Sequence, residues 1–127
     1  MERIKDGDFE VVVAGPAGFG NNIYVVVDHA NGAAAFVDAP DDVAQSIAAA
    51  EAAGAKPSVI LLTHSHGDHT ASLDKLKARY GCKVYGDVRE PWLKPGQLDQ
   101  AVSHGGKVTV GNLTFRVISV PGHTPGS

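Results

Sequence analysis

The sequence predicts an α+β fold in which one mixed β-sheet carries its helices on one face. Two observations lead to this class. Short β-branched runs come first along the chain, and further short strands then alternate with segments of helical periodicity. Neighbouring strands favour antiparallel pairs and strands separated by helices favour parallel pairs, so both kinds are expected in one sheet. The length suits a single domain, residues 1–127, around one core.

The first part of the chain contains three predicted strands. Residues 9–14 and 23–29 are β-branched runs, and the glycine-rich residues 15–22 form a turn between them. Residues 30–32 are a hairpin signal, because Asn and Gly tolerate positive φ. Residues 33–38 should therefore pair back as the third strand.

Two helices are predicted further along. A proline and two aspartates at 40–42 mark the start of the first helix, because acidic groups are favoured at a helix N-terminus. Its alanine-rich body, residues 42–53, should end at Gly54. Residues 70–80 carry apolar side chains on one helical face and should end at Gly81.

The remaining segments read as strands and irregular chain. Residues 58–63 are a short apolar run, which is typical of a strand covered on both faces. Residues 82–86 form another short strand, and residues 87–106 are expected to be irregular. Residues 107–111 and 113–120 should form a hairpin.

Composition limits the classes of function. The formal net charge is -3 without any long basic run, which argues against a nucleic-acid partner. No stretch approaches the roughly 18 apolar residues that cross a bilayer, and the charged N-terminus lacks a signal peptide. Cys82 is the single cysteine, so a reducing compartment and a cytoplasmic location are expected. It should be a small core residue rather than a nucleophile.

One loop concentrates side chains that bind metals. His64, His66, Asp68 and His69 lie within six positions directly after the apolar strand. Imidazole and carboxylate groups together suit zinc, and also manganese or iron. His123 lies far along the chain between Pro-Gly and Thr-Pro-Gly, in a loop that could deliver a remote ligand. His29 and His104 are placed in loops without an acidic or histidine partner nearby and are expected to be solvated.

These motifs resemble those of a known family. "THSHGDH" matches the T-H-x-H-x-D-H signature of the metallo-β-lactamase fold superfamily, and "PGHTPGS" matches the later loop that carries its third histidine ligand. "NNIYVVV" and "AFVDAP" resemble the upstream strand and the aspartate that ends the next one. The resemblance runs from about residue 9 to 127 and is strongest to glyoxalase II-like hydrolases. It implies an αββα sandwich, of which this chain would be roughly the first half.

The resemblance assigns the metal ligands. His64, His66 and His123 would bind the first ion, and Asp68 and His69 would bind the second. One or two zinc ions are implied, with iron or manganese possible.

The resemblance also implies a reaction. Asp38 would support the ligand loop through hydrogen bonds. Metal-bound hydroxide would attack the carbonyl of an ester, thioester or amide in a small-molecule substrate, with Asp68 orienting the nucleophile.

Two other interpretations stay open. The chain could be a metal-binding fragment without catalytic activity, or it could resemble persulfide dioxygenases, relatives that hold a single iron with two histidines and an aspartate. Half a sandwich would leave an apolar sheet face bare, so we expect the chain to pair with a second copy or with a complementary C-terminal fragment.

Overall fold

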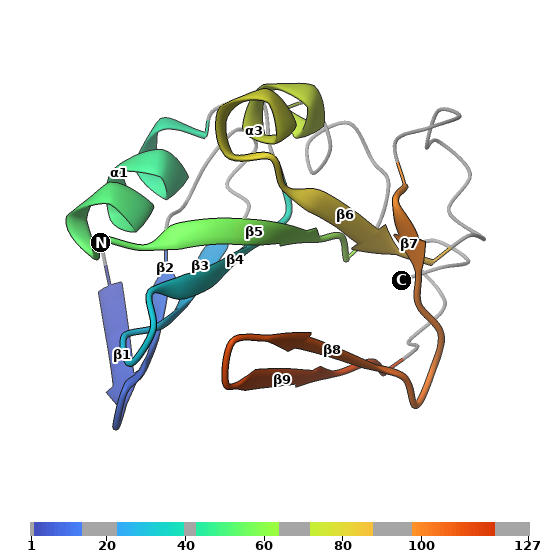
Figure 1. Cartoon of the computed structure of the whole chain (residues 1–127), viewed down its shortest axis with the longest axis horizontal. Coiled ribbons are helices and arrows are strands. Elements are labelled where there is room, and N and C mark those ends of the chain that lie inside the picture. Colours follow the sequence, from blue (N-terminus) through green and yellow to red (C-terminus); the bar gives the residue numbers. More distant parts are fainter. Residues whose placement is uncertain (1, 14–22, 40–42, 64–71, 88–97, 119–127) are drawn as a thin grey trace.

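A single mixed sheet with helices on one face organises the protein, as the sequence predicted (Figure 1). The structure, a computed structural model, describes residues 2–13, 23–39, 43–63, 72–87 and 98–118. Within these residues, seven strands follow one another across the sheet in the order β1-β2-β3-β4-β5-β6-β7, and β8 pairs with β9 in a separate hairpin.

The first four strands form an antiparallel meander. They are β1 (Glu2–Asp6), β2 (Phe9–Val13), β3 (Tyr24–Asp28) and β4 (Ala33–Val37), each paired with the next. The predicted strands at 9–14, 23–29 and 33–38 are confirmed. Successive valines of β2 and β3 point to opposite faces of the sheet, so these strands place apolar side chains on both faces.

The rest of the sheet is parallel. β5 (Lys56–Leu61), β6 (Lys83–Gly86) and β7 (Gln100–Ala101) continue from β4 in the same direction. The connections into β5 and β6 contain α1 (Ala44–Ala52) and α3 (Leu73–Tyr80) respectively. The carboxyl ends of these strands therefore meet at one edge of the sheet.

Both helices pack on the same face of the sheet. Phe36 and Ile60 from the sheet are fully buried with Ala50 of α1 and Leu76 of α3 in the main core. Cys82 lies in this core at 3% exposure, and burial raises the pKa of its thiol to about 11, as expected for a packing residue. None of the helices in the described part of the chain is long and apolar enough to span a membrane.

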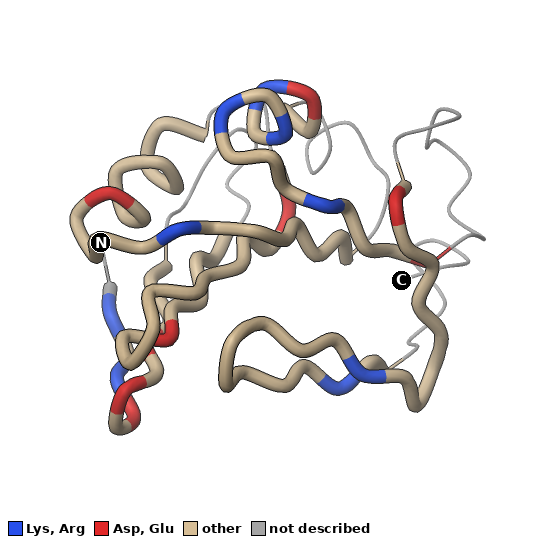
Figure 2. The backbone as a smooth tube through the Cα atoms, in the orientation of Figure 1, with Lys and Arg blue, Asp and Glu red and all other residues tan. Residues whose placement is uncertain are grey.

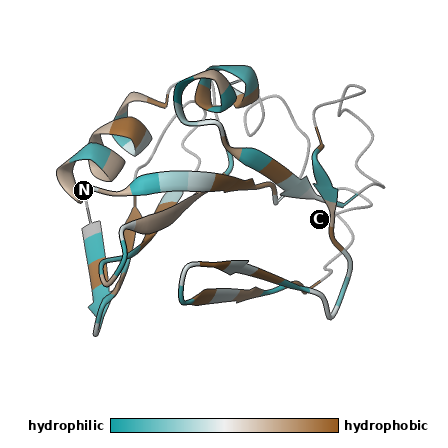
Figure 3. Ribbon diagram, viewed as in Figure 1, coloured by the Kyte–Doolittle hydropathy of each residue, from teal (hydrophilic) through white to brown (hydrophobic). Residues whose placement is uncertain are grey.

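The predicted C-terminal hairpin covers the opposite face. It consists of β8 (Lys107–Val110) and β9 (Leu113–Arg116), which pair antiparallel. Two buried valines of β8 pack on Ala35 of β4 and Val59 of β5. Figure 3 shows apolar segments on both β5 and the hairpin. Because Ile60 faces the helices and Val59 faces the hairpin, β5 is covered on both sides, as its apolar sequence predicted.

Two strands were not predicted. β1 has exposed charged residues at Arg3 and Lys5 and is held by its pairing with β2 across a turn at Gly7, where φ is +60°. β7 lies in the stretch expected to be irregular and has only two residues, too few to show a period. The proposed helix start at 40–42 lies outside the described residues.

Charged groups are spread over the coloured part of the chain in Figure 2, with both signs present on neighbouring elements.

Candidate metal centre

The carboxyl edge of the parallel strands brings together three polar residues. Asp38 directly follows β4, Thr63 follows β5 after one residue, and Asp87 directly follows β6. The hydrogen bonding between β4 and β5 continues past the end of β4, because the amide of Asp38 donates to the Leu61 carbonyl at 2.8 Å. The ends of these neighbouring strands are therefore held in register at this edge.

The Asp38 carboxylate binds both polar groups of Thr63. Its Oδ1 accepts a hydrogen bond from the Thr63 amide at 2.8 Å, and its Oδ2 accepts one from the Thr63 hydroxyl at 2.7 Å. Asp38 is only 2% exposed. Burying a carboxylate is costly unless it is hydrogen-bonded, so these contacts fix the chain where it leaves β5.

Asp38 also has an unusual backbone conformation. Its φ is +65°, and it is the one non-glycine residue with positive φ among those the structure describes. A side chain in this region costs roughly 1–2 kcal/mol, although aspartate tolerates it better than most residues. Such strain persists where surrounding contacts determine the conformation, which is common at functional sites.

The histidine loop is fastened at both ends to the same turn after β4. Thr63, directly before the loop, is bound by Asp38. Ser72, directly after it, donates its amide to the Ala39 carbonyl at 3.0 Å and is 5% exposed. Thr63 and Ser72, the residues on either side of 64–71, are thus bound to the consecutive residues 38 and 39 at the carboxyl edge.

The proposed ligands themselves lie outside the described residues: His64, His66, Asp68, His69 and His123. Their convergence on a metal stays a prediction. The residues that the structure does describe contain no group of three histidine, cysteine, aspartate or glutamate side chains that could hold an ion. Of the six predicted site residues, the structure describes Asp38 alone, and its role in supporting the ligand loop stays a prediction.

Asp87 was missed by the sequence analysis. It is 9% exposed and directly follows β6, at the same edge as Asp38. The available signal was the same in both cases, an acid directly after a short apolar strand. The expectation that residues from 87 onward are irregular hid this signal.

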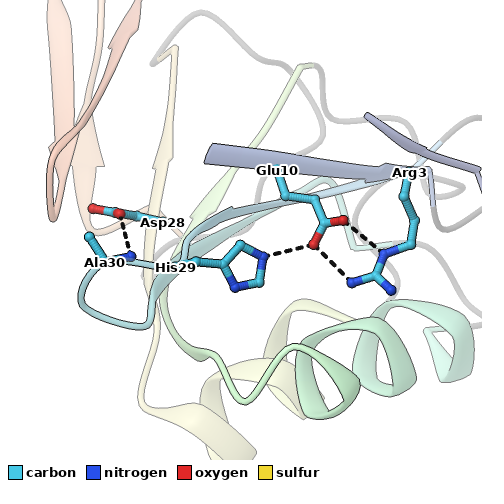
Figure 4. A network of polar contacts seen from close by, with 5 residues as sticks. All are labelled: Arg3, Glu10, Asp28, His29 and Ala30. Atoms are coloured by element: carbon cyan, nitrogen blue, oxygen red, sulfur yellow. Dashed lines mark hydrogen bonds and ion pairs between the residues drawn. The ribbon is translucent and has the colours of Figure 1, made fainter. Parts of the chain in front are cut away.

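The expectation that His29 lacks an acidic partner is wrong. Its Nε2 lies 2.8 Å from Oε1 of Glu10, and Arg3 donates to both carboxylate oxygens of Glu10 at 2.8 and 2.9 Å (Figure 4). Glu10 is 1% exposed, and the Arg3 guanidinium lowers the pKa of its carboxyl. These residues meet only because β2 pairs with β1 and β3, at the end of the sheet opposite to the carboxyl edge.

Comparison with known families decides the class of the protein. Residues 16–127 match the family model described as the metallo-beta-lactamase superfamily. The chain belongs to the metallo-beta-lactamase superfamily. The matched residues include 64–71, the final segment with His123, and Asp38.

Several similar curated relatives are named hydroxyacylglutathione hydrolase. A hydroxyacylglutathione hydrolase from Rhodopseudomonas palustris (strain ATCC BAA-98 / CGA009) is 43% identical over 101 residues, which are 80% of this chain and 39% of that protein. The hydroxyacylglutathione hydrolase of Acidiphilium cryptum is 43% identical over 95 residues, 75% of this chain and 38% of its own. The chain thus spans about two fifths of the length of these relatives.

Solved structures of the superfamily have the same fold. ETHE1 from Myxococcus xanthus superposes with a TM-score of 0.77 at 28% identity, over 94% of this chain and 51% of that one. The BLEG-1 B3 metallo-beta-lactamase gives a TM-score of 0.77 at 27% identity, over 94% and 64%. The mixed sheet with α1 and α3 therefore corresponds to the first part of the metallo-beta-lactamase fold.

Proposed function

We propose that this chain carries the metal-binding part of a zinc-dependent hydrolase, with a thioester of the hydroxyacylglutathione type as its substrate. The proposal depends on one observation. The residues on either side of 64–71 are hydrogen-bonded to the turn after β4: Thr63 to the side chain of Asp38, and Ser72 to the carbonyl of Ala39. A loop rich in metal ligands gains most from such support, because ligand position determines metal affinity. The name shared by the curated relatives supports the substrate class.

The donor set fits zinc. His64, His66 and His123 would hold one ion, and Asp68 with His69 would contribute to a second. Three imidazoles leave one position open in a tetrahedral site, which is the usual arrangement of catalytic zinc. A bound zinc ion supplies a Lewis acid and lowers the pKa of water to about 7, which provides hydroxide at neutral pH.

The chain's own residues would have distinct tasks. Asp68 would orient the nucleophilic water and accept its proton. Asp38 would act through Thr63: its two hydrogen bonds fix the residue next to His64, so that the imidazole needs little reordering when an ion binds. The shared sheet and core of the described elements support treating residues 1–127 as one domain, a part of the larger superfamily fold.

Elemental analysis together with thioester turnover tests this proposal. The purified chain should contain one to two zinc ions and hydrolyse a hydroxyacylglutathione thioester faster than a β-lactam. His66→Ala should lose most of the metal and the turnover. His104→Ala, the same change at an exposed loop position, should keep both.

Other results would redirect the proposal. Stoichiometric zinc without turnover would identify a metal-binding fragment without catalytic activity. Iron in the protein together with oxygen consumption would favour the dioxygenase-like alternative. A folded chain that binds no divalent metal would rule out a metal-dependent function altogether.

The sheet face on which the hairpin packs also has exposed apolar side chains, and these support a partner for the chain. The hairpin covers β4 and β5, whereas Ile4 and Phe9 on the same face of β1 and β2 are 56% and 38% exposed. Val11 and Val26 beside them are half-buried. We infer that a second copy or a complementary fragment packs on this face.

Sedimentation tests the association. The chain alone should form dimers at micromolar concentration, and Ile4→Lys should shift it toward monomer. A chain that gains a partner fragment should instead form a one-to-one complex. A stable monomer that binds neither would contradict the inference.

A further inference from the structure

A single buried carboxylate joins the two layers of the sheet structure. Asp28, at the end of β3, is 0% exposed. Its Oδ1 accepts a hydrogen bond from the Ala30 amide at 3.0 Å, inside the turn that leads to β4 (Figure 4). Its Oδ2 accepts one from the Asn112 amide at 3.0 Å, in the turn between β8 and β9. The same side chain thus binds one turn of the main sheet and one turn of the hairpin.

The two turns are also in close steric contact. Gly111, with φ of +59°, lies so near the first turn that a Cβ there would be 2.7 Å from the Ala33 Cβ and 2.8 Å from Nδ2 of Asn31. The Asn31 side chain is itself held, because its Oδ1 accepts from the Ala33 amide at 2.9 Å. Only glycine fits at 111, so sterics and hydrogen bonding independently fix the same contact.

The hairpin leads from this contact toward the candidate metal centre. The Asp28 contact holds the turn of the hairpin at the end of the sheet opposite to the carboxyl edge. The valines of the hairpin pack on Ala35 and Val59. From the turn, β9 runs back alongside β8 as far as Arg116, and the amide of Val117 donates to the Gly106 carbonyl at 2.9 Å. The segment with His123 follows directly.

We propose that Asp28 is a positioning residue for the metal centre: it sets the place of the β8–β9 hairpin on the sheet and thereby the delivery of His123. This inference rests on the proposed function. Asp28 touches neither metal nor substrate. It acts at a distance by fixing one end of a short hairpin, whose other end continues into the ligand segment.

Asp28→Asn separates the two hydrogen bonds. The bond to Ala30 is local, only two residues away, and an asparagine oxygen can keep it as an Asx turn. The amide nitrogen would then face the amide of Asn112, donor against donor. The variant should therefore lose the contact between the layers and keep the turn of the main sheet.

The test combines hydrogen exchange with zinc binding. In Asp28→Asn the Asn112 amide should exchange at least about tenfold faster, and zinc affinity, measured by competition with a chelator, should fall about tenfold, the lower end of what lost support costs a metal site. Asp6→Asn, the same change at an exposed position, should change neither quantity.

A second variant reaches the contact from the hairpin. Gly111→Ala introduces the clash with Ala33 and should weaken zinc binding in the same way. Gly7→Ala is its matched control: its φ of +60° is nearly the same, but nothing lies within 4 Å of its Cβ. Gly7→Ala also places a Cβ at positive φ but introduces no clash, so this variant should bind zinc like the wild type.

A double variant distinguishes positioning from general loss of stability. In a His123→Ala background, Asp28→Asn should not weaken zinc binding further, because the ligand that it positions is already absent. An additional tenfold loss there would overturn the inference. So would equal zinc affinity of the wild type and Asp28→Asn. A wild type that binds no zinc would overturn the proposed function and, with it, the delivery of His123.

Discussion

Replacement of Asp38 by alanine, glycine and asparagine separates the two properties of this residue, its hydrogen bonds and its backbone conformation. Alanine and glycine both remove the acceptors for the Thr63 amide and hydroxyl. A hydrogen bond to a buried charged group contributes about 1.5 kcal/mol, so either variant should lose about 3 kcal/mol. The loss is a large fraction of the stability of a small domain.

The backbone conformation then determines whether the alanine or the glycine variant is more stable. At a φ of +65° a Cβ costs roughly 1–2 kcal/mol, which glycine avoids. Asp38→Gly should therefore be about 1 kcal/mol more stable than Asp38→Ala, the reverse of the usual order. Asp38→Asn should lose less than about 1 kcal/mol, because its amide can accept from the Thr63 amide and donate to the hydroxyl, and asparagine tolerates positive φ.

Urea unfolding followed by circular dichroism measures these differences, with a chelator present so that bound metal does not contribute. Ala48→Gly, at an exposed position of α1, is the control for the usual order and should cost about 1 kcal/mol. If Asp38→Ala proves as stable as Asp38→Gly, the strain argument fails. If both match the wild type, the Thr63 contacts do not hold the loop.

Three further predictions concern acid, thiol chemistry and metal. Because Arg3 lowers the pKa of Glu10 in the folded state, the contribution of this carboxylate is present above its unfolded pKa of about 4.5 and is lost as pH falls below that value. In unfolding experiments from pH 6 to 3, the free energy of unfolding should therefore fall less in Glu10→Gln than in the wild type. An equal fall in both would show that the ion pair with Arg3 does not contribute. Cys82, with a pKa of about 11, should resist a thiol reagent at pH 8 in the native protein and react fully in urea; fast native labelling would contradict its burial. Zinc at 100 times its Kd should stabilise the fold by about 2.7 kcal/mol, and this gain should vanish with a chelator or in His66→Ala; equal stabilisation of that variant would place the ion elsewhere.

The sequence predicted the elements whose signal is local. β-Branched runs identified β2 and β3, the apolar run identified β5, and the glycines at 54 and 81 marked the ends of both helices, where φ is positive in each case. These features follow from periodicity and from the conformational freedom of glycine, which each stretch carries by itself.

Contacts between distant residues could not be predicted in this way. The partner of Asp28 is 84 positions away, and the hydrogen bond between Glu10 and His29 exists only once β2 and β3 are paired in register. β1 was missed for the same reason, since its charged sequence forms a strand only against β2. In the candidate site, the motif identified Asp38, whereas its bonds to Thr63 depend on the parallel pairing of β4 with β5.

The charged edge of β1 bears on how copies of the chain would meet. Arg3 and Lys5 stand on the outermost strand of the described sheet and are exposed. A second sheet that joined strand to strand along this border, in an antiparallel manner, would set cations near cations, and charged border strands discourage such growth in natural proteins. Any self-association would thereby favour stacking of one sheet face on another, which would close after two copies instead of extending into a fibre.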